Sequence, residues 1–187
     1  PKIPANSART WQELNPTLDK GELNIQLLDK VRDAVIAGES IQARFNINNT
    51  DRSVGASLSG FIAKTAGKEG AKQPIQVNFN GSAGQSFGVW NSPGLELTLC
   101  GDANDYVGKG MSGGKITIHP PLGSTFLSDR SAIMGNTCLY GASGGKLFAA
   151  GTAGERFAVR NSGSTAVVEG VGDNACEYMT GGVVLIL

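Results

Sequence analysis

Three cysteines and a single histidine are the residues of this 187-residue chain best suited to metal binding or nucleophilic catalysis. Cys100, Cys138 and Cys176 are spaced 38 and 38 residues apart, and thiolates brought together by a repeating fold can hold an iron–sulfur cluster. The repeat register argues against a cluster, because Cys138 and Cys176 each precede a tyrosine by two residues and Cys100 does not. His119 stands alone before two prolines, where a packing or surface role is common. We therefore expect no catalytic, cofactor-binding or metal-binding residue, and cysteines that behave as small hydrophobic residues.

Two glycine-rich stretches resemble phosphate-binding loops but lack the required surroundings. Residues 108–113 satisfy GxGxxG, yet a dinucleotide fingerprint must open a helix, and the alternating residues 115–118 predict a strand. Gly114-Lys115 resembles the end of a Walker A loop, but Ile116 stands where a magnesium-binding Ser or Thr is needed. Turns with left-handed backbone explain these glycines more simply.

The most charged short motif is the turn Thr50-Asp51-Arg52. An arginine and a carboxylate can form a bidentate pair across an interface, so Asp51 and Arg52 are candidate contacts to a neighbouring domain. A solvated turn is the alternative for this motif. Glu155-Arg156 and Arg160-Asn161 form a second candidate of the same kind, with apolar residues expected inside and charges outside.

A glycine repeat predicts the elements that position these residues. Three passages share a tyrosine, a turn of small residues that ends in Gly-Gly, and an apolar strand, and glycines recur in steps of 18 to 22 residues from Gly81 to Gly181. That period suits one rung of a parallel β-solenoid. The expected structural repeat glycines are Gly81, Gly84, Gly88, Gly113, Gly114, Gly144, Gly145, Gly181 and Gly182.

Residues 1–80 differ from the rest and predict a helix and strand entrance to the repeats, which occupy residues 81–187. Apolar residues at helical spacing predict a helix over 24–37 that stops at Gly38, and alternation predicts a strand over 41–47. A short helix over 58–65 and a strand over 73–79 follow. We expect one structural domain that is a fragment of a longer chain, because the chain ends inside an apolar strand.

Composition excludes several classes of function. Lysine plus arginine and aspartate plus glutamate both number 16, so the charge predicts neither nucleic-acid nor membrane binding. No apolar run has the length of a membrane-spanning helix. Three cysteines do not suggest a secreted disulfide scaffold, and we expect the cytoplasm, or the plastid stroma, as the compartment.

Six strings in order, at residues 49–55, 81–88, 103–114, 135–145, 154–162 and 176–182, closely resemble the C-terminal glycine-repeat (GXGXG) domain of the glutamate synthase large subunit. The resemblance covers most of the chain, from about Leu18 onward. It implies an all-β fold, a right-handed parallel β-helix, with a GxxGxxxG pattern at Gly81, Gly84 and Gly88.

The resemblance also implies a function without chemistry in this segment. Glutamate synthase makes glutamate from glutamine and 2-oxoglutarate in ammonia assimilation, using an amidotransferase domain and a synthase domain with FMN and an iron–sulfur cluster. This segment would be the scaffold that positions those two domains. The partners would be these domains of the same enzyme, together with a small NADPH-dependent subunit or ferredoxin.

Two other functional hypotheses remain open from the sequence. The chain could be a stand-alone β-helix subunit of a multisubunit oxidoreductase, either a separate glutamate synthase chain or a relative of the formylmethanofuran dehydrogenase chain that has the same fold. It could also be an independent β-helix enzyme or glycan-binding protein. The acidic residues fall near turns in different registers, which gives this last hypothesis no support.

Overall fold

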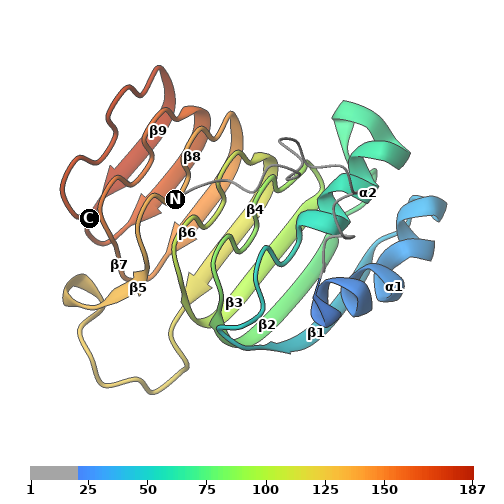
Figure 1. Ribbon diagram of the computed structural model, residues 1–187, viewed down its shortest axis with the longest axis horizontal. Helices are drawn as coiled ribbons and strands as arrows, with labels where there is room; N and C mark the ends of the chain where they lie inside the picture. Colours follow the sequence, from blue (N-terminus) through green and yellow to red (C-terminus); the bar gives the residue numbers. More distant parts are fainter. Residues whose placement is uncertain (1–20) are drawn as a thin grey trace, which may run out of the picture.

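A computed structural model of the chain describes residues 21–187, so the first 20 residues of the expected entrance lie outside the described residues. Its strands form one parallel sheet with two α-helices at the β1 end (Figure 1). The helical elements are α1 (Glu22–Ala37), α2 (Ala56–Ala66) and the 3₁₀ turns η1 (Gly67–Glu69) and η2 (Ser128–Arg130). The strands are β1 (Ile41–Ile47), β2 (Ile75–Ala83), β3 (Leu95–Ala103), β4 (Ser112–His119), β5 (Ala132–Met134), β6 (Gly144–Ala149), β7 (Thr152–Ala153), β8 (Ser162–Val168) and β9 (Gly181–Ile186).

The sheet order is β1-β2-β3-β4-β6-β8-β9, with β5 beside β3 and β7. The register aligns inward apolar residues in rows, for example Phe45 with Phe79, Leu99 and Ile118. Because side chains alternate along a strand, each row of this kind faces the core as a whole. The core therefore runs continuously along the sheet.

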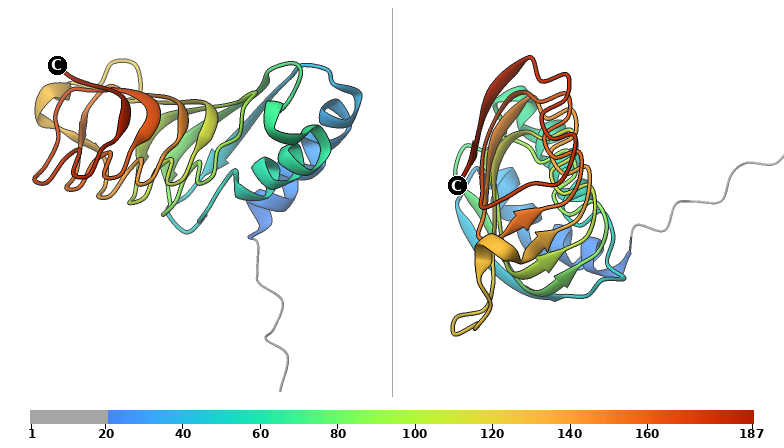
Figure 2. Two further views of the ribbon diagram at one scale, coloured as in Figure 1. Left: turned by 90° about the horizontal axis from the view of Figure 1, so that it is seen from above. Right: turned by 90° about the vertical axis from the view of Figure 1, so that its left-hand side faces the viewer.

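Turn segments carry the chain back between strands and cover the inner face of the sheet (Figure 2). We call residues 85–90, 105–110, 136–141, 155–160 and 173–178 the return segments. Each contains three alternate residues with positive φ: 86, 88, 90; 106, 108, 110; 137, 139, 141; 156, 158, 160; and 174, 176, 178.

The return segments are joined by backbone hydrogen bonds that run in both directions. The Gly108 amide donates to the Phe87 carbonyl of the preceding segment at 2.9 Å, and the Gly110 amide donates to the Tyr140 carbonyl of the following segment at 2.8 Å. Alternate residues repeat this arrangement from segment to segment. A turn that would otherwise carry unpaired backbone groups is satisfied in this way by its two neighbours.

The expectation of an all-β right-handed β-helix is wrong. Helices are interleaved with the parallel strands of a single sheet, so the fold is of the α/β type. The glycine repeats dominate the sequence pattern, so the sequence predicts the helices only as an entrance to the repeats. However, Leu58 and Ile62 of α2 are fully buried in the same core as the strand residues, because α2 lies in the crossover from β1 to β2.

The individual helices and first strands agree closely with the sequence pattern. Helix α1 begins two residues before the predicted 24–37 and buries one stripe that includes Leu27 and Val31, and Gly38 ends it with φ 69°. Helix α2 extends the predicted 58–65 at both ends, and β1 has the predicted bounds. No helix among residues 21–187 is long and apolar enough to cross a membrane.

The three repeat tyrosines do not occupy equivalent positions, contrary to the alignment drawn from the sequence. Tyr106 has positive φ at the start of its return segment, Tyr178 has it at the end, and Tyr140 lies just before a positive-φ residue, Gly141. The second glycines of the three pairs, by contrast, do align, because Gly114, Gly145 and Gly182 directly precede residues of one row of the sheet, Lys115, Lys146 and Val183. Loops of different length separate tyrosine from Gly-Gly, and the strand register follows the glycines.

Candidate functional site

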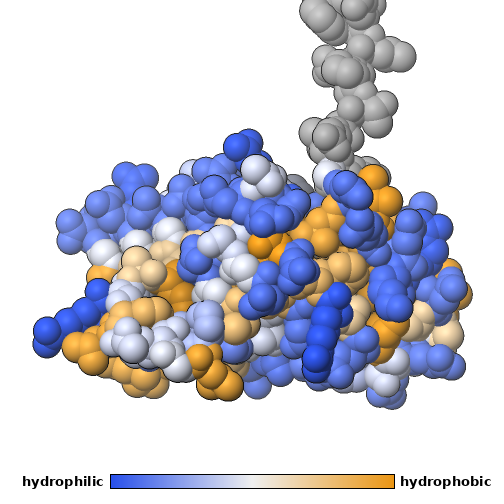
Figure 3. Space-filling view, turned by 90° about the horizontal axis from the view of Figure 1, so that it is seen from below, coloured by the Kyte–Doolittle hydropathy of each residue, from blue (hydrophilic) through white to orange (hydrophobic). Residues whose placement is uncertain are grey.

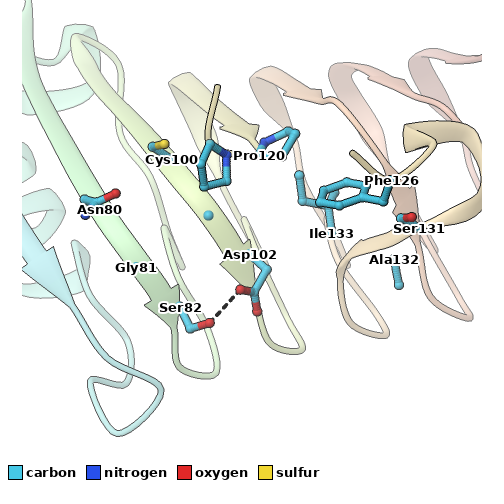
Figure 4. Close-up of a pocket in the computed structure, with 12 residues that line it drawn as sticks. Asn80, Gly81, Ser82, Cys100, Asp102, Pro120, Phe126, Ser131, Ala132 and Ile133 are labelled. Carbon is cyan, nitrogen blue, oxygen red and sulfur yellow. Dashed lines mark hydrogen bonds between the residues drawn. The ribbon is translucent and has the colours of Figure 1, made fainter. Parts of the chain in front are cut away.

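A hollow beside polar side chains lies at the carboxyl edge of the sheet, where parallel sheets commonly bind ligands. Strands β2 and β3 end there, and residues of the loop between β4 and β5, among them Pro120 and Phe126, line the hollow as well (Figure 4). The resulting cavity has a volume of about 580 Å³. It is lined by Asn80, Gly81, Ser82, Cys100, Gly101, Asp102, Pro120, Pro121, Phe126, Ser131, Ala132 and Ile133.

The floor of the cavity is polar and carries one charge. The Ser82 hydroxyl donates to Asp102 Oδ1 at 2.6 Å across the β2–β3 pair, as the dashed line in Figure 4 shows. Asp102 is the one charged residue among the lining residues, and it has no ion-pair partner within residues 21–187. The second carboxylate oxygen is therefore available to a donor that enters the cavity.

The wall of the cavity is apolar and belongs to the loop between β4 and β5. Phe126 and Ile133, both labelled in Figure 4, line this side of the cavity. Phe126 remains 48% exposed, while two other side chains of the loop, Leu122 and Leu127, are 100% and 60% exposed. Hydrophobic surface gathers at the loop end of the molecule, on the left in Figure 3. Exposed apolar side chains on a projecting loop are typical of an interaction site.

A second, smaller cavity of about 280 Å³ adjoins the first and shares Asp102, Ala132 and Ile133 with it. Asn49, from the turn after β1, lines this second cavity. The Asn104 amide donates to Asn49 Oδ1 at 3.0 Å and so connects that turn to the end of β3. One surface therefore extends from the turn after β1 to the loop after β4.

The predicted interdomain residues Asp51 and Arg52 lie in this turn but do not pair with each other. Asp51 Oδ2 accepts a hydrogen bond from the Asn48 amide at 2.8 Å, which stabilises the turn itself. The Arg52 carbonyl accepts from the Asn24 side chain of α1 at 3.2 Å. The Arg52 residue is exposed, and no ion pair of its guanidinium occurs within the described part of the chain.

The repeat glycines lie where backbones approach closely. A Cβ at Gly84 would lie 2.5 Å from the Asp51 carbonyl oxygen, so this glycine lets the turn after β1 pack against the end of β2. The second glycine of each Gly-Gly pair, at positions 114, 145 and 182, has positive φ and closely contacts the backbone of the neighbouring segment. Added side chains would likewise meet neighbouring atoms at Gly81, Gly88, Gly113, Gly144 and Gly181.

The cysteines and the histidine are dispersed. Cys100 lines the large cavity on the outward face, whereas Cys138 is buried inside, where burial raises the pKa of its thiol to about 12. Burial also raises the pKa of Cys176. His119 Nδ1 lies 2.9 Å from its neighbouring Pro120 carbonyl oxygen. No group of three potential metal-ligating side chains occurs within residues 21–187.

The remaining sequence motifs have structural positions. Residues 108–110 lie in a return segment and β4 follows, so the GxGxxG stretch leads into a strand as predicted. Arg156 and Arg160 both have positive φ on the outer side of their return segment. The Arg160 guanidinium lies 5.9 Å from the ring centroid of Tyr178 in the next segment. These two arginines lie away from the cavity at the carboxyl edge.

Sequence reasoning did not find the cavity or the roles of Ser82, Asp102 and Phe126 in it. Ser82 and Asp102 are twenty positions apart and become neighbours only through the parallel register of β2 and β3. One signal was present in the sequence: a stretch after two prolines, residues 122–127, carries three large apolar residues outside any predicted strand. Exposed apolar residues in a loop of this kind indicate a contact surface.

Comparison with known proteins gives consistent results. A family model described as the GXGXG motif matches residues 24–187. The ferredoxin-dependent glutamate synthase of Pyropia yezoensis is 54% identical over 95% of this chain and 12% of its own length. The glutamate synthase [NADPH] large chain of Azospirillum brasilense is 48% identical over 98% of this chain and 12% of its own. The glutamate synthase [NADH] of Schizosaccharomyces pombe is 54% identical over 88% of this chain and 8% of its own. The chain thus spans only a small part of these relatives.

Proposed function

The chain belongs to the GXGXG motif family, and we propose that it is the interdomain scaffold of a glutamate synthase whose catalytic domains lie elsewhere in the polypeptide. The observation that carries this proposal is the match itself: almost the whole chain aligns with about a tenth of each glutamate synthase. The resemblance found in the six sequence strings is confirmed at the level of the family.

The proposed activity of the complete protein is the formation of glutamate from glutamine and 2-oxoglutarate. FMN and an iron–sulfur cluster would belong to the synthase domain, and the amidotransferase and synthase domains would be the partners of this segment. The names of the relatives include ferredoxin, NADPH and NADH as electron donors, so the donor for this protein would be one of these. Cytoplasm or plastid stroma would be the compartment.

Three features of the described residues support a positioning role for this segment. The sheet and its return segments form a continuous hydrogen-bonded unit, which is a rigid support. The residues suited to catalysis are dispersed, so this region would act through contacts with its neighbours. The carboxyl edge presents the turn with Arg52 and the loop with Phe126, and these exposed groups would contact the catalytic domains.

The alternative functions from the sequence receive less support. A stand-alone subunit or an independent glycan-binding protein would be expected to resemble proteins of similar length. The named relatives are instead long glutamate synthases, which favours a domain within such an enzyme.

Replacement of Arg52 in the full-length protein tests the scaffold. We expect Arg52→Ala to lower glutamine-dependent glutamate formation and to raise the ammonia released per glutamate, because a loosened domain contact lets ammonia escape. Glutamine hydrolysis and FMN reduction, measured separately, should keep their wild-type rates. Arg44→Ala, which removes another exposed arginine from the outward face of β1, is the matched control and should leave the ammonia ratio unchanged.

Two results would count against the proposal. An unchanged ammonia ratio in Arg52→Ala would remove Arg52 from the contact between domains. Loss of glutamine hydrolysis or of FMN reduction itself, in a variant that remains folded, would contradict a purely structural role for this segment.

A further inference from the structure

The cavity at the carboxyl edge has one carboxylate and an aromatic wall, but no cation. Asp102 supplies the carboxylate, Phe126 supplies the aromatic ring, and the remaining lining residues are neutral. Neither ion pair of residues 21–187 includes Asp102. A cavity with this charge and shape is complementary to a positively charged group that also has apolar surface.

We propose that this cavity binds an arginine side chain carried by another domain of the same polypeptide. The inference rests on the proposed function, since it takes the occupant from the remainder of a glutamate synthase. Beyond that function, the inference names the group that anchors the neighbouring domain, an arginine side chain, and the cavity that binds this group.

The polar floor suits a guanidinium group. Ser82 donates to Asp102 Oδ1 and holds the carboxylate on the outward face of the β2–β3 pair. An incoming guanidinium can donate two parallel N–H groups to the carboxylate, which is the strongest geometry for such a pair. The side-chain carbonyl of Asn80, another lining residue on the outward face of β2, can accept a further N–H group.

The apolar wall favours arginine over lysine. A guanidinium is planar and weakly hydrated, so it can stack on the ring of Phe126 while it bonds to Asp102. The methylene groups of the arginine would pack against Pro120, Pro121 and Ile133, which also line the cavity. A compact, strongly hydrated ammonium would gain less from this apolar surface.

Another part of the same polypeptide is the occupant that the surroundings favour. Leu122 and Leu127 belong to the same loop as Phe126 and are mostly exposed, so the loop that lines the cavity also offers apolar surface to a folded partner. The related proteins extend far beyond the matched region, and most of their length is available to supply the partner. A small free ligand in the cavity would leave these two leucines of the loop uncovered.

Cys100 is a native reporter for occupancy, because it lines the cavity. In the full-length protein, N-ethylmaleimide should alkylate Cys100 slowly, as measured by peptide mass spectrometry. Asp102→Asn should raise that rate by about tenfold, the factor that corresponds to about 1.4 kcal/mol of lost affinity. The substituted amide still accepts from Ser82, so the floor is preserved. Asp173→Asn, the same change at an exposed return-segment residue, should leave the rate unchanged.

A cross-link identifies the occupant. The photoreactive residue p-benzoylphenylalanine replaces Phe126 in the full-length protein, and the expected product joins it to an arginine-containing peptide from outside residues 1–187 of the same polypeptide. A product within residues 1–187, a product with a second polypeptide, or no product would each overturn the proposal. Equal alkylation of Cys100 in the wild type and in Asp102→Asn would also overturn it.

These results are separate from those that test the scaffold. If Arg52→Ala releases ammonia while Cys100 reacts equally in wild type and Asp102→Asn, the scaffold stands and the arginine site fails. If Asp102→Asn exposes Cys100 and the Phe126 cross-link has the expected product while Arg52→Ala leaves the ammonia ratio unchanged, the arginine site stands without the proposed role of Arg52.

Discussion

Left-handed backbone at single residues is the feature that shapes the return segments. Glycine adopts this conformation without steric cost, whereas at each other residue it costs about 1–2 kcal/mol of conformational free energy. The structure nevertheless has positive φ at Leu139, Ala158 and Cys176, where earlier return segments have Gly88 and Gly108. Stacked hydrogen bonds from both neighbouring segments offset this cost.

Gly114 differs from these positions because both its conformation and its surroundings exclude a side chain. A Cβ there would overlap the Leu95 carbonyl oxygen, whereas one at Gly141, also left-handed, would meet no atom within 4 Å. We expect Gly141→Ala to cost about 1 kcal/mol of stability and Gly114→Ala at least about 3 kcal/mol. Amide hydrogen exchange of β4 in the full-length protein measures both values. Equal losses of stability in the two variants would show that the left-handed conformation alone, and not the contact with Leu95, sets the cost of the added side chain.

At the residue scale, left-handed backbone occurs at glycines and at other residues alike. The sequence pattern predicts left-handed turns at the Gly-Gly pairs, and the second member of each pair has positive φ. The positive φ of Trp90 and Arg160 could not be predicted from the sequence, because residues with large side chains rarely adopt this conformation. The alignment of the repeats on their tyrosines is wrong for the same reason, because the sequence does not show which residues of a return segment have positive φ.

Strands β3 and β4 are joined on the outward face by an ion pair. Lys115 Nζ lies 2.8 Å from Glu96 Oε2, and the Gln76 side chain donates to the same oxygen at 3.1 Å. The hydrogen bond from Lys115 is the main cause that lowers the pKa of Glu96 below its ordinary value of 4.5, against an opposing effect of burial. Both side chains are partly exposed, so the pair contributes little.

The lowered pKa fixes the direction of the pH dependence. The pair stabilises the folded state above the ordinary pKa of the carboxyl group, and this contribution is lost as the pH falls through the lower folded pKa. Glu96→Gln should therefore reduce stability by about 0.5 kcal/mol at pH 7 and by nothing at strongly acidic pH. Hydrogen exchange of β3 across this range measures the difference. A difference that grows on acidification would contradict the assignment.

Helices and strands with a clear hydrophobic periodicity were predicted well from the sequence, whereas the fold class of the molecule was not. The helical stripe of α1 and the alternation of β1 depend only on local residues, so both were found with nearly correct bounds. The α/β class depends on how α2, in the crossover from β1 to β2, packs into the same core as the strands, which is a long-range property. The cavity could not be predicted from the sequence either, because its lining residues come from β2, β3 and the loop after β4, which meet only in the folded chain.

Over the whole molecule, hydrogen bonds connect α1 to the segment that follows β1, and we expect the helices and the sheet to unfold as one cooperative unit. Asn24 of α1 donates to the Arg52 carbonyl and accepts from the Gly55 amide at 3.1 Å, which connects α1 to the segment between β1 and α2. Asn24 is buried, so its loss leaves polar groups without partners in the core.

Asn24→Ala should consequently weaken the whole unit by about 1–3 kcal/mol. Peptides of β2 should exchange amide hydrogens faster together with those of α1 in the full-length protein. Gln26→Ala, which removes an exposed bond to Glu22 within the same helix, should change neither. Faster exchange confined to α1 would show that the helix is a separate unit and would contradict this view.

Pairing between strands that are close in the sequence has a consequence for biosynthesis. Each strand pairs in parallel with one from the preceding or following repeat, as Ile75 does with Leu95 and Leu147 with Ala166. Loop closure over such short distances is entropically cheap. The domain can therefore be assembled strand by strand as the chain leaves the ribosome, with every completed strand acting as the template for the next.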